Sequence, residues 1–171
     1  IGTAVGLAMR GYAPVAEIQF DWFLFPAFDQ ITAQVARLHL RSAGTLSMRI
    51  VIRVPNGGGI GAVEHHSESP EAYFAHTPGL RIVTPSNPAD AFMMIRQAIA
   101  HPDPILFMEP KRRYWDKAEV DEGAALAPLP GERSWNPFDP HAWYYGRKNR
   151  KLKQSTLVTI AYSAGFWIAW G

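Results

Sequence analysis

Glycines, histidines and carboxylates are concentrated in one stretch of the sequence, PNGGGIGAVEHHSESPEAYFAHTPG at residues 55–79. Glycine-rich loops can hold phosphates through backbone N–H groups. GGGIG, however, is followed by no Lys-Ser or Lys-Thr pair, and it does not stand directly between a strand and a helix. The simplest alternative is that these glycines allow a tight turn or the close approach of another backbone.

Side chains of metal-ligand types are dense within the same stretch, at Glu64, His65, His66 and Glu68. Neighbouring residues of a loop point in different directions, and the HExxH spacing of a helical zinc site is absent. A single catalytic histidine is a further possibility, because imidazole transfers protons near neutral pH. From these residues alone, a phosphate site, a metal site, a catalytic histidine and a structural loop all remain open.

Two basic segments offer other chemistry. EPKRRYW (109–115) stands where an expected strand ends, which is where sites gather in open α/β sheets, so a binding edge and a subunit contact are both possible. RKNRKLK (147–153) follows Trp143 and Tyr144, an arrangement that could stack nucleic-acid bases. Most charge runs are simply solvated, and no nucleic-acid-binding motif accompanies this one. We therefore expect no nucleic-acid partner.

The composition is that of a globular protein. The 171 residues are 47% hydrophobic and 19% charged, and the net charge is +2. Since there is no cysteine, disulfides, thiolate metal sites and cysteine nucleophiles are excluded. Residues 154–171 are uncharged, but their polar residues favour a buried strand leading into a helix over a membrane span. We expect a cytoplasmic protein without a membrane partner.

Helical and strand-like patterns alternate along residues 2–108. Helices are expected at 2–11, from Pro26 to about Leu38, at 70–76 with Ser69 as the cap, and at 88–101 with Asn87 as the cap. Strands are expected at 13–20, 48–54, 80–83 and 105–108. This alternation predicts an α/β fold with a parallel sheet that helices cover on both faces.

The remainder of the chain predicts a boundary between two domains. Residues 1–115 form the expected first domain, which looks incomplete at its N-terminus. Residues 116–155 are rich in proline and aromatics without a clear period, which is typical of an extended linker. Residues 156–171 would begin a second domain that is cut off, so the sequence is expected to be a fragment truncated at both ends.

Three stretches together carry a family resemblance: AEIQFDWFLFPAFDQI (16–31), RVPNGGGIGAVEHHSESPEAYFAHTPGLRIVTPSNPADA (53–91) and PILFMEPKRRYWDKAEV (104–120). They resemble the beta subunit of the thiamine-diphosphate-dependent decarboxylase component of 2-oxoacid dehydrogenase complexes, most closely the bacterial branched-chain type. The similarity is nearly continuous over 1–120 and slight over 121–155. It implies the pyrimidine-binding domain of a transketolase-like thiamine-diphosphate fold, followed at TLVTIAY by the start of the family's C-terminal domain.

The resemblance implies a function and partners. The expected activity is that of a branched-chain 2-oxoacid dehydrogenase (3-methyl-2-oxobutanoate dehydrogenase), which decarboxylates 2-oxoacids oxidatively and passes the acyl group to lipoyl arms in branched-chain amino acid catabolism. An alpha subunit would supply the diphosphate site and its Mg²⁺ in an alpha2beta2 heterotetramer, and a lipoyl-bearing acyltransferase would be the further partner. The alternatives are pyruvate dehydrogenase, another transketolase-like beta subunit, or a non-catalytic module that binds such a partner.

The resemblance also implies site residues. Phe23 would pack against the pyrimidine of thiamine diphosphate, Gln19 would line the same pocket, and His66 would be the catalytic histidine near the lipoyl entrance. The family's essential glutamate is expected just upstream of Ile1, so the isolated chain is predicted to be inactive.

A monovalent cation site, with K⁺ as the candidate ion, is a further feature of relatives. It would use mostly backbone oxygens of two turns, with the candidates Ile50, Ala98, His101 and Asp103. His101 and Asp103 stand where relatives often carry Asp and Asn, so this chain departs from the pattern there. No other protein-held metal is expected.

Overall fold

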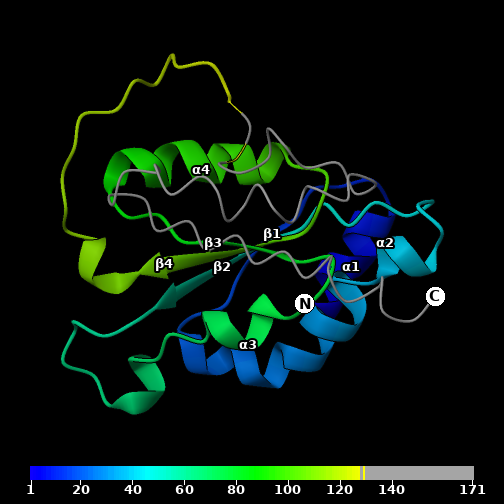
Figure 1. The fold of residues 1–171 in the computed structure, drawn as a ribbon, viewed down its shortest axis with the longest axis horizontal. Helices are drawn as coiled ribbons and strands as arrows, with labels where there is room; N and C mark the ends of the chain where they lie inside the picture. Colours follow the sequence, from blue (N-terminus) through cyan, green and yellow to red (C-terminus); the bar gives the residue numbers. More distant parts are fainter. Residues whose placement is uncertain (128, 130–171) are drawn as a thin grey trace, which may run out of the picture.

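A four-stranded parallel sheet forms the centre of the computed structural model, which describes residues 1–127 and 129 (Figure 1). The strands are β1 (Val15–Glu17), β2 (Val51–Asn56), β3 (Arg81–Val83) and β4 (Ile105–Pro110). Their order is β1-β2-β4-β3, and every neighbouring pair is parallel. The expected α/β fold with a parallel sheet is therefore confirmed.

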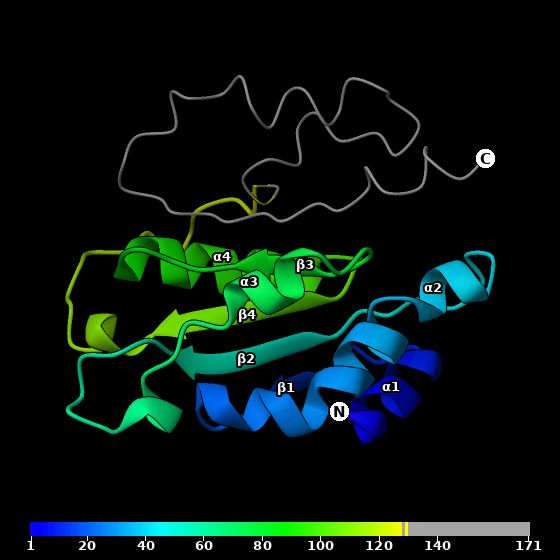
Figure 2. The same cartoon turned by 60° about the horizontal axis from the view of Figure 1, so that its bottom comes forward.

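Helices cover both faces of this sheet. The helices are α1 (Gly2–Met9), α2 (Leu38–Arg41), α3 (Glu71–Ala75) and α4 (Pro88–Ala100), together with the 3₁₀ helices η1 (Asp21–Ala27), η3 (Glu64–His66) and η4 (Lys111–Arg113) and the π-helical segment η2 (Gln30–Val35). Helix α4 lies along one face, whereas α1, α3 and η2 lie on the other (Figures 1 and 2). Within the described residues, no helix is both long and apolar enough to cross a membrane.

The alternation of side chains along the central strands divides the interior into two cores. Ile52 and Val54 of β2, with Leu106 of β4, face the core that α1, η2 and α3 help to build. Val51 and Phe107 face the other core, against α4. Successive strand residues point to opposite faces, so the apolar run IVI (50–52) serves both cores.

The chain leaves β1 earlier than the sequence predicted. A strand was expected over 13–20, but β1 ends at Glu17, and Ile18 still donates its N–H to the Arg53 carbonyl. Phe20 then takes a positive φ of 71° and turns the chain into η1. Because this conformation is rare for a bulky side chain, propensity alone could not have predicted the turn.

The expected helix from Pro26 is also wrong in its form. Pro26 lies inside the 3₁₀ helix η1, and a π-helical segment follows, in which Ala36 donates its N–H to the Ile31 carbonyl at 3.0 Å. Proline has no N–H to donate, which disfavours a regular α-helix through this position. Ile31 and Val35 nevertheless point into the core, as their spacing predicted.

The two predicted helix caps had different outcomes. The Asn87 side chain accepts a hydrogen bond from the Asp90 N–H at 2.9 Å, so the cap of α4 is confirmed. The Ser69 cap is wrong: α3 begins at Glu71, with Pro70 before it and no side-chain cap. The proline takes the capping position, since its own missing N–H leaves one fewer donor to satisfy.

One glycine is required where a loop passes η2. Gly79 has φ of +85°, and a Cβ on it would lie 2.0 Å from the Ala36 carbonyl oxygen. No other residue type fits both restraints.

The domain boundaries stay predictions, because residues 128 and 130–171, with most of the expected linker and the expected second domain, lie outside the described residues.

Candidate functional site

Three segments that follow parallel strands meet at the carboxyl edge of the sheet. Helix η1 follows β1, η3 belongs to the loop that follows β2, and η4 directly follows β4. The arrowheads of β2 and β4 point toward these segments (Figure 1). Sites in open α/β sheets form at this edge because the connecting segments converge there.

An aromatic cluster around His66 occupies this edge. The His66 ring centroid lies 4.3 Å from that of Phe20, 6.1 Å from that of Phe23 and 4.1 Å from that of His65. The Phe23 residue is 50% exposed although its ring is large and apolar. The structure therefore brings together two of the three residues that the resemblance singled out, and Gln19 is exposed on the same segment.

The polar atoms of this cluster suit a flat heteroaromatic ligand. His66 Nδ1 is buried and has no hydrogen-bond partner. A buried polar atom without a partner is uncommon, and a bound group can supply the missing hydrogen bond. Together with the exposed ring of Phe23, this atom fits a planar ring that carries nitrogen atoms.

A buried ion pair lies beside the cluster. Lys111 Nζ lies 3.4 Å from Asp21 Oδ2, and the two residues are 3% and 0% exposed. The ammonium also lies 5.3 Å from the centroid of the Phe20 ring.

The segment EPKRRYW was expected at a site or a subunit contact, but Asp21 was missed. The available signal was a lone carboxylate inside the apolar run QFDWFLF.

The glycine-rich loop after β2 is held at both ends. Gly57 N–H donates to the Glu68 carbonyl at 2.6 Å, and Asn56 Nδ2 donates to Glu71 Oε1. Gly59 has φ of +110°, and a Cβ there would lie 2.9 Å from Arg112 Cβ. The prediction that glycines of this loop permit the close approach of another segment is thus confirmed at Gly59, which lies against Arg112.

The metal-ligand types in this loop do not converge. Glu64 Oε1 lies 3.7 Å from His65 Nδ1. Across residues 1–127 and 129, no group of three or more His, Asp or Glu side chains is placed to hold a metal ion. The arrangement supports contact between aromatic rings rather than metal ligation by this loop.

The cation candidates gather at the opposite, amino edge of the sheet. The Ile50 carbonyl accepts a hydrogen bond from the Ile105 N–H at 2.8 Å, and the Ala98 carbonyl accepts one from the His101 N–H at 3.2 Å. The Asp103 N–H donates to His101 Nδ1 at 2.9 Å. These oxygens and the imidazole already have protein partners, and the role of the four residues stays a prediction.

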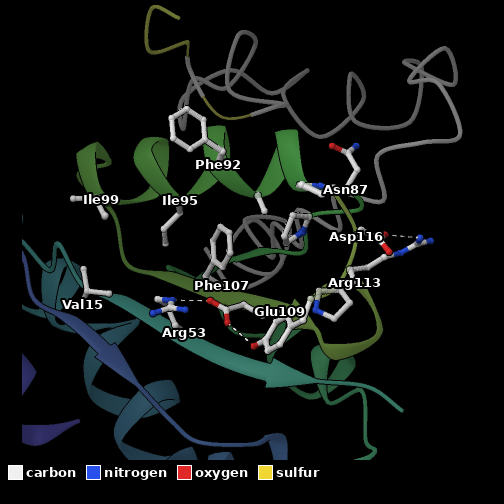
Figure 3. A pocket seen from close by; sticks show the side chains of 15 residues that line it. Val15, Arg53, Asn87, Phe92, Ile95, Ile99, Phe107, Glu109, Arg113 and Asp116 are labelled. Atoms are coloured by element: carbon white, nitrogen blue, oxygen red, sulfur yellow. Dashed lines mark hydrogen bonds and ion pairs between the residues drawn. The ribbon is translucent and has the colours of Figure 1, made fainter. Parts of the chain in front are cut away.

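A groove on the α4 face of the sheet was not predicted (Figure 3). Its volume is about 560 Å³, and apolar side chains of α4, among them Phe92, Ile95 and Ile99, line it together with Phe107. Phe23, Gln19, His66 and the cation candidates lie outside it, whereas Glu109, Pro110, Arg113 and Tyr114 of the possible binding edge EPKRRYW line it. The signal in the sequence was the helical spacing of these apolar positions along 88–100.

Polar groups close one end of this groove. Arg53 Nε donates to Glu109 Oε1 at 2.6 Å, and Tyr114 Oη donates to Glu109 Oε2 at 2.8 Å (Figure 3). The hydrogen bond to Glu109 raises the pKa of Arg53. Burial, followed by the hydrogen bond to Glu109, raises the pKa of Tyr114. The three groups form a satisfied network, which favours a structural role.

Comparison with known proteins adds a family match. Residues 1–116 match the model of the transketolase pyrimidine binding domain. The chain is 62% identical over 133 residues to "Pyruvate dehydrogenase E1 component subunit beta" of Leifsonia xyli, covering 78% of this chain and 40% of that protein. It is 51% identical over 129 residues to "3-methyl-2-oxobutanoate dehydrogenase subunit beta" of Mycobacterium tuberculosis, covering 75% and 37%.

A third relative aligns over the whole chain. "Pyruvate dehydrogenase E1 component subunit beta" of Acholeplasma laidlawii is 50% identical over 171 residues, which is 100% of this chain and 45% of that protein. The alignment includes 121–155, where little resemblance was expected. The chain spans about 40% of the length of the relatives that it matches.

A solved structure supports the fold alone. "Split gene transketolase, inactive beta4 tetramer" matches with a TM-score of 0.55 and 20% identity, covering 76% of this chain and 38% of that one. Beta subunits of both pyruvate and branched-chain enzymes are among the relatives, and the Leifsonia pyruvate dehydrogenase subunit is more similar than the branched-chain subunit from Mycobacterium. The expected branched-chain type is therefore not confirmed.

Proposed function

This chain belongs to the transketolase pyrimidine-binding domain family, and on that premise we propose that it forms the beta-subunit half of a thiamine-diphosphate site that decarboxylates 2-oxoacids oxidatively. The observation that carries the proposal is the pairing of a half-exposed Phe23 ring with His66, whose Nδ1 is buried and unpartnered. Bound thiamine diphosphate would supply an electron sink for loss of carbon dioxide.

The residues at the carboxyl edge would divide the work. The Phe23 ring would pack against the coenzyme's pyrimidine and keep water from that face. Gln19 would line the same pocket. His66 would hold or deliver a proton during acyl transfer to a lipoyl group, a task that suits imidazole near neutral pH.

The proposal includes partners. An alpha subunit would hold the diphosphate and Mg²⁺, and two copies of each chain would form a heterotetramer that serves a lipoyl-bearing acyltransferase in the cytoplasm. Exposed aromatic residues near the site, Trp22, Phe23 and Tyr73, support a partner-covered edge. Such residues are enriched at protein interfaces. The alternative function is a module that binds the partner without catalysis.

The substrate that we propose is a 2-oxoacid of either the pyruvate or the branched-chain class, whereas the sequence suggested the branched-chain class. Relatives that act in pyruvate and in branched-chain dehydrogenases share this domain, so either 2-oxoacid class is compatible with it. We propose the branched-chain class as the first to test, on the HHSESPE and EPKRRYW segments. Assays of the assembled protein on 2-oxoisovalerate and on pyruvate would decide between them.

Coenzyme binding is the direct test of the function. The chain is mixed with an alpha subunit of a 2-oxoacid dehydrogenase and Mg²⁺, and the Kd for thiamine diphosphate is measured by equilibrium dialysis. Phe23→Ala should weaken binding about fivefold, because the ring's stacking contact is worth roughly 1 kcal/mol. Tyr12→Ala, at an exposed aromatic residue that precedes β1, is the control and should change the Kd less than about twofold.

Two outcomes separate the hypotheses. If the parent mixture retains no coenzyme, the proposed function is wrong and the partner-binding module remains. If it binds coenzyme, His66→Gln in a full-length beta subunit paired with the alpha subunit should lower acyl transfer to a lipoyl acceptor by about a hundredfold and change the Kd much less. Equal transfer by parent and variant would remove His66 from the mechanism.

A further inference from the structure

We propose that the buried ion pair between Asp21 and Lys111 is a positioning device, which fixes Phe20 and through it the imidazole of His66. The role as a positioning pair for proton transfer rests on the proposed function. The geometry that it requires is present in this chain alone. The Phe20 ring lies 5.3 Å from the Lys111 ammonium and 4.3 Å from the His66 ring, so the effect of the pair would pass through Phe20.

The pair joins two segments that are distant in the sequence. Asp21 begins η1 after β1, and Lys111 begins η4 after β4. The side chain of Asp21 is 0% exposed and that of Lys111 is 3% exposed. Charges so deeply buried are tolerated when they are paired, and removing one partner leaves the other uncompensated. The pair therefore holds η1 against η4.

Asp21 uses its two carboxylate oxygens for two purposes. Oδ2 accepts the hydrogen bond from Lys111 Nζ at 3.4 Å. Oδ1 accepts one from the backbone N–H of Trp22 at 3.1 Å, within the first turn of η1. The direction in which η1 leaves the sheet is thus tied to the position of the Lys111 ammonium, and Phe23 follows in the same turn.

Phe20 lies in a conformation that needs support. Its φ of 71° and ψ of 151° are unusual for an aromatic residue and persist only when surrounding contacts hold them. Its carbonyl accepts a hydrogen bond from the Phe23 N–H at 3.3 Å, and its ring centroid lies 5.3 Å from the Lys111 ammonium and 4.3 Å from that of His66. A cation over an aromatic face is attracted by the ring's electron density.

The His66 ring depends on these neighbours for its orientation. Its Nδ1 has no hydrogen-bond partner, so no hydrogen bond at that atom fixes the imidazole plane. Contacts with the rings of Phe20, Phe23 and His65 do so instead. If Lys111 lost its charge, Phe20 could relax toward an ordinary extended conformation, and the imidazole would turn with it.

The first readout needs no coenzyme and no partner. The Hδ2 and Hε1 resonances of His66 are recorded by NMR in the 171-residue chain, because neighbouring rings shift them. Lys111→Met and Asp21→Asn should each move both resonances, whereas Lys111→Arg, which keeps the charge, should restore most of the parent shifts. Arg113→Met, in the same turn η4 with an exposed side chain, is the matched control and should move neither.

The second readout uses a full-length beta subunit that contains this domain, assembled with an alpha subunit, because the 171-residue chain is predicted to be inactive. Lys111→Met should lower kcat for acyl transfer at least about tenfold, a larger change than the weakening of thiamine diphosphate binding. A purely structural role would instead reduce the amount of folded protein and leave the kcat of the folded fraction unchanged.

A double variant covers the case in which a single variant fails to fold. Asp21→Asn/Lys111→Met leaves no unpaired buried charge, so it should fold and still show displaced His66 resonances. Parent-like His66 resonances in any folded variant that lacks the Lys111 charge would overturn the positioning proposal. If the resonances move but the parent assembly binds no coenzyme, the pair still orients His66 and it is the proposed function that fails.

Discussion

Arg81 and Asp103 form an ion pair at the amino edge of the sheet, with 3.0 Å between Arg81 Nη2 and Asp103 Oδ2. The side chain of Arg81 is 8% exposed. Its Nε also donates to the same carboxylate oxygen, at 3.2 Å. A fixed positive charge thus already neutralises the carboxylate that was a candidate ligand for a monovalent cation.

The first prediction concerns potassium. Because the guanidinium occupies the carboxylate of Asp103, and the Ile50 carbonyl already accepts a hydrogen bond, K⁺ should add little stability. The melting temperature of the chain in KCl and in choline chloride of equal concentration should agree within about 1 °C. A larger and saturable rise with K⁺ would instead support the cation site at Ile50, Ala98, His101 and Asp103.

The second prediction concerns alkaline pH. Burial and the hydrogen bond to Glu109 raise the pKa of Tyr114, so this phenol stays protonated in the folded chain where it ionises in the unfolded one. Its contribution to the free energy of unfolding is complete below about pH 10 and is lost as the pH rises toward the folded pKa. Tyr114→Phe should therefore flatten the fall in stability above about pH 10, measured by urea unfolding.

Absorbance at the tyrosinate band provides the check on Tyr114. The rise near pH 10 should be the same in the parent and in Tyr114→Phe, because Tyr114 does not contribute to it. The Tyr114→Phe variant should lack only the further rise in tyrosinate absorbance that the parent shows at higher pH, when Tyr114 ionises. A smaller rise near pH 10 in the variant would show that the network with Glu109 does not protect this hydroxyl.

The third prediction compares two glycines. Gly79→Ala should destabilise the chain by more than about 2 kcal/mol, because Gly79 has a positive φ and a Cβ would lie 2.0 Å from the Ala36 carbonyl oxygen. Gly6→Ala is the control: a Cβ there meets nothing within 4 Å, and alanine favours the helix α1. It should stabilise by roughly 0.5–1 kcal/mol in thermal unfolding. Equal effects at the two positions would contradict the close approach.

The fourth prediction concerns the start of α4. Asn87→Ala removes the side-chain oxygen that accepts from the Asp90 N–H, and should cost about 1 kcal/mol in urea unfolding. Asn87→Ser keeps an acceptor at the cap and should recover most of that loss. If both variants lose the same stability, the contacts of Asn87 with Ser86 and the Asp90 carboxylate matter more than the cap.

The sequence predicted the parts of the fold whose signals are local. The apolar run at β4 and the Asn-Pro cap of α4 begin where they were expected, because burial and a cap are local signals. The strand expected over 48–54 is also present, but β2 begins at Val51 and ends at Asn56. Residues 20–35 could not be predicted in this way. The left-handed Phe20 and the change from 3₁₀ to π geometry depend on contacts with distant segments rather than on propensity.

The site was predicted only in part for the same reason. The family resemblance pointed to Phe23 and His66, and the structure places their rings 6.1 Å apart. The sequence could not join Asp21 to Lys111, because nothing local shows that the segments after β1 and β4 meet. The groove beside α4 was missed because the spacing of apolar residues along a helix does not show whether another element covers that face.

The sheet separates two cores of unequal extent, and this difference determines which part of the described residues unfolds locally first. The larger core lies on the side of α1, η2 and α3, while the smaller one lies under α4 beside the open groove. Local unfolding begins where fewer apolar contacts must be broken. Amide hydrogens of α4 should therefore exchange with solvent before those of β2 and β4, so that the scaffold beneath His66 persists through the commonest fluctuations of the molecule.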